Sequence, residues 1–189
     1  RGASLTRGDL GARSQIFGTT TDYLNTTNYG VAKGRFFTNS EDRSGARVAL
    51  LGHDVAENLF PNEDPIGKKF KIDGIRFRVL GVMEKQGKFL GLFSFDTQVI
   101  IPSGATQRLF SRRGFIRISV KVPADKIEES KDEIYGIMRQ IRGLKPSEKD
   151  DFAVNQTMAF ENIYNGIKFT IGGIGLFITT LSLVVGGIG

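Results

Sequence analysis

The chain has 189 residues, enough for one domain of moderate size or two small ones. Its formal net charge is +6. It contains no cysteine, which excludes a disulfide scaffold and a Cys-ligated metal site. No basic helix and no aromatic RNA-binding signature accompanies the positive charge, so we expect no nucleic acid partner; an anionic membrane surface or envelope polymer explains the same surplus.

Short predicted strands alternate with brief helices in the first 60 residues. Residues 13–30 predict a strand and then a brief helix around Asp22–Thr26, and residues 38–45 predict a polar loop. The apolar run at residues 46–51 lies between two glycines and predicts a buried strand. Residues 53–60 predict a short helix that a proline ends. Its apolar face would hold Val55, Ala56, Leu59 and Phe60.

The strongest β signal is a hairpin within residues 67–83, where apolar and charged residues alternate around Asp73-Gly74, a two-residue type I′ turn signature. This turn would pair Ile72 with Ile75, Lys71 with Arg76, Phe70 with Phe77 and Lys69 with Arg78. The apolar pairs would share one face and the four cations the other. Like charges directly opposite each other destabilise a hairpin. We therefore expect acidic residues elsewhere in the fold or an anionic partner to offset the cost, unless the face is simply solvated because the cost is small. The candidate partner-contact residues are Lys69, Lys71, Arg76 and Arg78.

A glycine-punctuated loop with three Phe and two Leu follows at residues 86–95. An exposed apolar loop can mark a partner or substrate contact, and packing of these side chains into the core beneath the loop is the alternative. A strand over residues 97–101 and a helix over residues 104–110 come next. The candidate contact residues of the loop are Phe89, Leu90, Leu92 and Phe93.

A β-α-β unit of about 40 residues is predicted towards the end of the charged part of the chain. Residues 115–122 alternate apolar and polar side chains and predict a half-buried strand. Residues 125–142 carry apolar side chains at helical spacing, with Gly143 as the helix stop. Residues 152–156 predict the second strand. The pattern indicates a small α/β layer of the ferredoxin-like kind.

The chain offers no convincing catalytic or cofactor-binding pattern. Its Gly-Lys pairs lack the spacing of a phosphate-binding loop. His53 is the only histidine, so a zinc site or Ser–His catalysis built on it has no second partner. The acidic residues occur in runs, whose neighbours do not face each other across a cleft as an acid/base pair must. We therefore expect no cofactor, no metal site and no enzymatic activity on this chain.

The last segment, Ile171–Gly189, contains no charged residue. A helix of that length spans roughly 28 Å, close to the thickness of a hydrocarbon core, so we predict the start of a transmembrane helix; a buried core helix or a strand-and-turn region is the alternative. A helical apolar stripe over Phe160–Ile171 would join this helix to the folded domain. Because the chain begins with Arg1 and stops within the apolar run, we expect it to be a piece of a longer protein.

The predicted membrane helix carries small residues at intervals of three and four, which would let another membrane helix pack closely. They are Gly172, Gly175, Thr179, Ser182, Gly186 and Gly189.

Several ordered segments together resemble the extracytoplasmic core domain of MacB-type ABC-transporter permeases, within the FtsX-like permease superfamily. The segments are GRFFT at residues 34–38, ARVALLGHDVAENLF at 46–60, EDPIGKKFKIDGIRFRVLGVM at 63–83 and LSLVVGGIG at 181–189. Residues 18–24, 101–102 and 150–152 fit the same template in the same order. No single motif is specific, but their order along nearly the whole chain is.

This resemblance implies an α+β fold in three parts. Residues 1–45 and 111–160 would form a porter-like α/β (βαβ) subdomain, residues 46–110 an inserted mostly-β subdomain, and residues 161–189 a stalk and the start of a transmembrane α-helix. The implied location is the inner or plasma membrane, with residues 1 to about 165 on the extracytoplasmic side.

The implied function is that of a permease subunit of an ATP-driven exporter, whose outer domain is moved by the membrane helices and handles a substrate or partner by mechanotransmission. The implied partners are an ABC ATPase subunit or domain, a second permease copy, an envelope adaptor protein and membrane lipid. A membrane-anchored regulator of a cell-wall hydrolase is the alternative, because some relatives have that role. A sensor or binding domain without transport is a further alternative.

Overall fold

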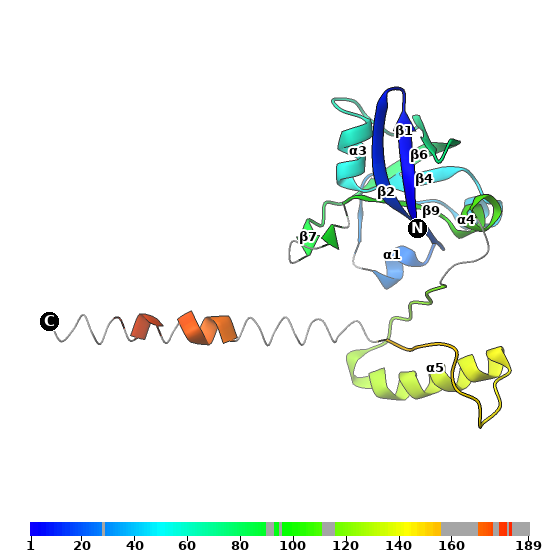
Figure 1. The fold of residues 1–189 in the computed structure, drawn as a ribbon, viewed down its shortest axis with the longest axis vertical. Coiled ribbons are helices and arrows are strands. Elements are labelled where there is room, and N and C mark those ends of the chain that lie inside the picture. Colours follow the sequence, from blue (N-terminus) through cyan, green and yellow to red (C-terminus); the bar gives the residue numbers. More distant parts are fainter. Residues whose placement is uncertain are drawn as a thin grey trace. The chain divides into compact units, whose positions relative to one another are not determined.

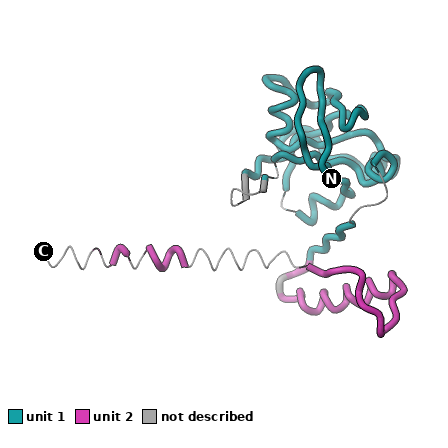
Figure 2. The backbone as a smooth tube through the Cα atoms, viewed as in Figure 1, with its two compact units in different colours: residues 1–121 teal, residues 122–189 magenta. Residues whose placement is uncertain are grey.

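The structure, a computed structural model, separates the chain into two compact units, residues 1–121 and residues 122–189 (Figure 2). It describes residues 1–27, 29–89, 93–94, 96–110, 116–155, 170–175, 178–180 and 182.

A seven-stranded mixed sheet forms the centre of the first unit (Figure 1). The strand order is β3-β6-β4-β9-β2-β1-β5, and β5 also pairs with β6. Six of the strands therefore close into a ring, and β3 pairs with residues 81–83 of β6, beyond the stretch of β6 that pairs with β5. The strands are β1 Gly2–Arg7, β2 Leu10–Thr19, β3 Val31–Gly34, β4 Val48–Leu51, β5 Lys69–Ile72, β6 Ile75–Met83 and β9 Gln98–Pro102.

The main hydrophobic core lies inside this ring. Alternate residues of β5 and β6 point inward, so that Phe70 and Phe77 are 2% and 1% exposed. Helix α3, His53–Leu59, adds Val55, Ala56 and Leu59 to the same cluster. Each fully buried Val, Leu or Phe side chain stabilises the fold by about 1.5–3 kcal/mol. The ring is therefore a packed body and not a channel.

A second apolar cluster covers part of the outer surface of the ring. It contains Phe37, Val48, Leu50, Leu80, Met83 and Ile100, with Tyr23 and Phe36 packed against it. Three short helices contact this side or flank it: α1 Tyr23–Thr26, α2 Asn39–Arg43 and α4 Ser103–Leu109. The outer face of the β5–β6 hairpin lies beyond this cluster and stays open to solvent.

Most of the elements predicted before residue 110 are confirmed. The buried strand at 46–51 is β4, the helix at 53–60 is α3, the strand at 97–101 is β9 and the helix at 104–110 is α4. The prediction of a polar loop over residues 38–45 is wrong in part, because α2 forms there behind a capping box between Thr38 and Glu41. That helix buries no residue, so it has no apolar face for a periodicity search to find.

The sheet also crosses the subdomain boundary that we expected between residues 45 and 46. Strands from residues 2–34 pair directly with strands from residues 69–102: β1 with β5, β2 with β9 and β3 with β6. The first unit therefore joins residues 1–45 to residues 46–110 in one sheet. The pairing of residues 1–45 with residues 111–160 in a porter-like layer stays a prediction.

The second unit is built on α5, Ile127–Arg142, which follows the short 3-10 helix Ala124–Lys126. Gly143 ends α5 in the left-handed conformation, as predicted, with φ of 67°. The chain then turns back along the helix. Ion pairs from Arg139 to Asp150 and from Arg142 to Asp151 hold it there.

The strands predicted on either side of α5 are not found in the described residues. Residues 116–123 and 152–155 have no strand pairing, and the side chains of Ile116 and Ile118 are 88% and 68% exposed. Alternation predicts which face of a strand is apolar, but a strand also needs a neighbour to hydrogen-bond with. No described residue supplies that neighbour here, so only the helix of the expected βαβ layer is found among the described residues.

Residues 170–175, 178–180 and 182 of the apolar tail are helical. Among the described residues, no helix has the length and apolar content needed to cross a membrane. The other residues of 161–189, and with them most of the predicted stripe over Phe160–Ile171, lie outside the described residues. The transmembrane helix therefore stays a prediction.

Candidate functional site

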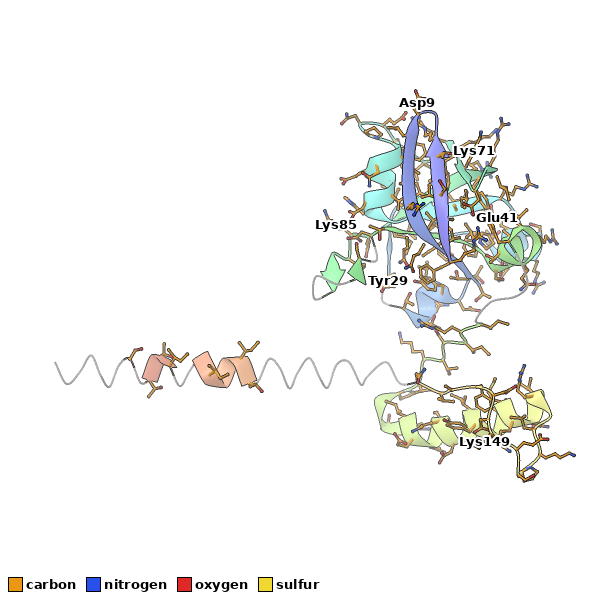
Figure 3. The ribbon with its side chains drawn as sticks, in the orientation of Figure 1. Asp9, Tyr29, Glu41, Lys71, Lys85 and Lys149 are labelled. Carbon is orange, nitrogen blue, oxygen red and sulfur yellow. The ribbon has the colours of Figure 1, made fainter. Side chains whose placement is uncertain are left out.

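The β5–β6 hairpin has the predicted register, and it places four cations on one open surface. Lys69 lies opposite Arg78, and Lys71 lies opposite Arg76. Asp73 and Gly74 adopt φ of 47° and 84°, as a type I′ turn requires. All four cations are exposed, and Figure 3 labels Lys71 beside β1. We call Lys69, Lys71, Arg76 and Arg78 the basic face.

Two carboxylates close to the hairpin in the sequence, Asp73 and Glu63, are paired with other cations. Asp73 forms an ion pair with Arg1 and accepts a hydrogen bond from the backbone N–H of Ser4 at 2.9 Å. Glu63 forms ion pairs with Arg7 and Lys68. Within the described part of the chain, no ion pair within 4.0 Å involves a cation of the basic face. The first expected source of compensation, acidic residues elsewhere in the fold, is therefore not found there.

Cationic partners lower the pKa values of two carboxylates, Glu41 and Glu63. A hydrogen bond from Arg35, supported by the backbone of Thr38, lowers the pKa of Glu41 to about 2. Hydrogen bonds from Lys68 and Arg7 likewise lower the pKa of Glu63. Both groups are thus charged near neutral pH, and their charges are already matched by nearby cations.

A shallow hollow of about 270 Å³ continues the basic face at the end remote from the turn. Arg78 belongs to both features, because it lines the hollow together with Gly34, Arg35, Ile66, Gly67, Val79 and Leu80. The hollow requires the glycine at position 34: its φ is +79°, and an added Cβ would lie 2.2 Å from the carbonyl oxygen of Leu80. The hairpin surface thus runs from the turn through two rows of cations to this depression.

The apolar loop after β6 is described only in part. Strands β7, Lys88–Phe89, and β8, Phe93–Ser94, pair with each other, with Phe89 opposite Phe93. Leu90 and Leu92 lie outside the described residues, as do the side chains of Phe89 and Phe93. Their proposed partner contact therefore stays a prediction.

Asp96 holds the base of this loop, a role that we did not predict from the sequence. Its side chain is buried, with the residue 3% exposed. Its two carboxylate oxygens accept hydrogen bonds from the backbone N–H groups of Gln86 and Gly87, each at 2.8 Å. A lone Asp after an apolar loop gives no sequence signal for such a clamp, because the contact depends on where the loop returns.

The predicted helix-packing stripe in the tail is partly described. Gly172, Gly175, Thr179 and Ser182 are in helical residues, and the Thr179 hydroxyl donates to the carbonyl of Gly175 at 2.5 Å. Gly186 and Gly189 lie outside the described residues. The packing role of the stripe therefore stays a prediction.

His53, Asp54 and Glu57 are brought together at the start of α3. Nδ1 of His53 lies 3.6 Å from an Asp54 oxygen and 3.7 Å from a Glu57 oxygen, and has no hydrogen-bond partner. The spacing i, i+1, i+4 on a seven-residue helix produces this grouping by itself, and the Glu57 side chain is 69% exposed. We assign it no metal.

A family model described as the MacB-like periplasmic core domain matches residues 2–136. The chain is 32% identical over 195 residues to the macrolide export ATP-binding/permease protein MacB of Rhodospirillum rubrum, covering 100% of the chain and 29% of that protein. It is 28% identical over 191 residues to the pyoverdine export ATP-binding/permease protein PvdT of Pseudomonas savastanoi, covering 99% of the chain and 28% of that protein. The chain thus spans less than a third of the length of either relative.

Two solved structures share the fold. The extracellular domain of the noncanonic ABC-type transporter YknZ from Gram-positive bacteria matches with a TM-score of 0.66 and 22% identity, over 77% of this chain and 73% of that one. The periplasmic region of MacB from Actinobacillus actinomycetemcomitans matches with a TM-score of 0.65 and 20% identity, over 87% of this chain and 72% of that one.

Proposed function

The chain belongs to the family of MacB-like periplasmic core domains, and from that premise we propose that it is the extracytoplasmic domain of the permease of an ATP-driven exporter. The observation that carries the proposal is the family match over residues 2–136, together with similarity along the whole chain to two export permeases. Both relatives are named ATP-binding/permease proteins. We therefore propose an ABC ATPase, as a fused domain or separate subunit, as the source of energy.

The proposed role of this domain is mechanical. ATP-driven movement of membrane helices would pass through the segment after residue 155 to the folded domain outside the membrane. The closed ring of strands supports this role, because a close-packed core lets a domain move as one body. On this proposal the protein lies in the inner or plasma membrane, works with a second permease copy and contacts lipid and an envelope adaptor protein.

The test uses the full-length protein that carries this chain, reconstituted with its ATPase in proteoliposomes. The chain has no cysteine, so Lys85→Cys, at an exposed position labelled in Figure 3, gives one site for a spin label in this domain once any cysteine elsewhere in the full-length protein is replaced by serine. We expect the distance between the labels of two copies to differ between the ATP-bound and ADP-bound states. An unchanged distance would overturn the mechanical role.

A flexible insertion then tests the transmission itself. A Gly-Ser-Gly-Ser insertion after Asn155 should abolish the distance change while ATP hydrolysis continues, because a flexible joint does not pass on movement. The same insertion between Gly8 and Asp9, in the exposed turn between β1 and β2, is the matched control and should leave the change intact. A distance change that survives the insertion after Asn155 would contradict the proposal.

A further inference from the structure

The basic face and the hollow form one linear track along the β5–β6 hairpin. The first row is Lys71 with Arg76, the second is Lys69 with Arg78, and the hollow beside Arg78 comes next. Side chains on one face of a strand repeat about every 7 Å along it, and those of paired residues lie about 5 Å apart. The two rows of cations are therefore about 7 Å apart, and the hollow begins roughly one further step along.

The cations make this track complementary to negative charge. Within each row two like charges lie directly opposite each other at short range, which disfavours the free hairpin. The described residues offer no carboxylate to any of the four cations within ion-pair distance. An external anion at each row would therefore replace repulsion with attraction. Charge complementarity of this kind chooses partners and orients them.

The surroundings of the track favour a protein partner over other anionic surfaces. A face that enters the lipid needs exposed apolar side chains, and none of the exposed large hydrophobic residues in the described chain belongs to β5 or β6. Anionic headgroups attract basic residues without such insertion, but they carry no apolar side chain for the hollow. Single-stranded nucleic acid needs aromatic side chains on which its bases stack, and Phe70 and Phe77 are turned inward. The hollow is large enough for one apolar side chain, which a phosphate polymer does not carry.

We propose that the basic face and the hollow are a docking site for an extended acidic segment of a protein partner. Alternate residues of an extended chain repeat at nearly the spacing of the rows. The segment that fits therefore reads acidic-x-acidic-x-apolar, with one carboxylate at each row and the apolar side chain in the hollow. This site extends beyond the mechanical role above and does not depend on it.

The experiment measures binding of two labelled synthetic peptides to the purified chain in mild detergent, at an ionic strength near 0.15 M. The first peptide contains Asp-Ser-Glu-Ser-Leu, and the second contains Asp-Ser-Leu-Ser-Glu, with the same composition and charge. Fluorescence anisotropy should show the first peptide binding more tightly, because only its leucine reaches the hollow when both carboxylates meet the cations. Equal affinity for the two peptides would overturn the proposed track.

Charge reversal tests the protein side. The double variant Lys71→Glu, Arg76→Glu should bind the first peptide about tenfold more weakly or worse, since two attractions become repulsions. The control variant Lys126→Glu, Lys149→Glu makes the same change in net charge at exposed positions of the second unit and should bind as before. Circular dichroism checks that both variants are folded. Equal weakening in both variants, or tighter binding of polyphosphate of matched charge than of the first peptide, would overturn the proposal.

Discussion

Glu41 and Thr38 cap each other at the start of α2. The backbone N–H of Glu41 donates to the Thr38 hydroxyl at 3.3 Å, and the backbone N–H of Thr38 donates to the Glu41 carboxylate at 2.8 Å. Arg35 adds two hydrogen bonds of 2.8 Å to the same carboxylate. One ionised side chain therefore holds both the entry to α2 and the residue after β3.

The low pKa of Glu41 predicts a loss of stability in acid. Its pKa is lowered from 4.5 to about 2 by Arg35 and Thr38, so the folded state prefers the charged form. The stabilisation is complete above the unfolded pKa and is lost as the pH falls from about 4.5 to about 2. Glu41→Gln should cost about 1 kcal/mol in urea unfolding at pH 7, and the gap to the wild type should shrink at pH 3.

Glu57→Gln is the matched control for this measurement. The Glu57 side chain is 69% exposed, so we expect a change of a few tenths of a kcal/mol at most at pH 7. A gap between wild type and Glu41→Gln that is as large at pH 3 as at pH 7 would show that the carboxylate charge does not contribute.

The parts of the fold that could be predicted are those set by neighbours in sequence. Asp73-Gly74 allows a two-residue turn, which pins the register of the hairpin, and the alternation of Phe70 with its charged neighbours then chooses the inner face. The helix α3 follows in the same way from the 3.6-residue spacing of Val55 and Leu59. In both cases the signal lies within a few consecutive residues, and the buried residues of the structure are the ones that the spacing of apolar residues predicts.

The parts that could not be predicted depend on contacts between distant segments. Pairing of β1 with β5 joins residues more than 60 positions apart, and nothing in residues 2–7 identifies that partner strand. The hollow likewise needs Gly34 to meet Leu80. Residues 116–122 show the reverse case, since a clear alternation predicts a strand but cannot supply its neighbour.

Gly34→Ala should destabilise the first unit strongly. The new Cβ would lie 2.2 Å from a backbone oxygen, at a φ of +79° that residues with side chains rarely adopt, and a backbone atom cannot move aside cheaply. We expect a loss of about 2 kcal/mol or more in urea unfolding followed by circular dichroism. Gly2→Ala is the control, because its Cβ would meet no atom within 4 Å; equal effects would argue against the close approach.

Asp96→Asn should loosen the base of the apolar loop. The amide keeps one acceptor oxygen, so the N–H of either Gln86 or Gly87 loses its partner beside a buried side chain. The expected cost is about 1–3 kcal/mol, and hydrogen exchange should accelerate at these two amides. Asp9→Asn, in an exposed turn, should change neither. Unchanged protection at Gln86 and Gly87 in Asp96→Asn would exclude the clamp.

Lys71→Glu should stabilise the free protein, although it removes part of the proposed docking site. Lys71 lies directly opposite Arg76, so the substitution turns a like-charged cross-strand pair into an opposite-charged one. The expected gain is about 0.2–1 kcal/mol in urea unfolding, and it should diminish in high salt. Lys126→Glu is the control, because Lys126 lies in a short helix and has no residue opposite it on a neighbouring strand. A loss of stability in Lys71→Glu would mean that the cation is already compensated within the chain, and the case for an anionic partner would lose its physical basis.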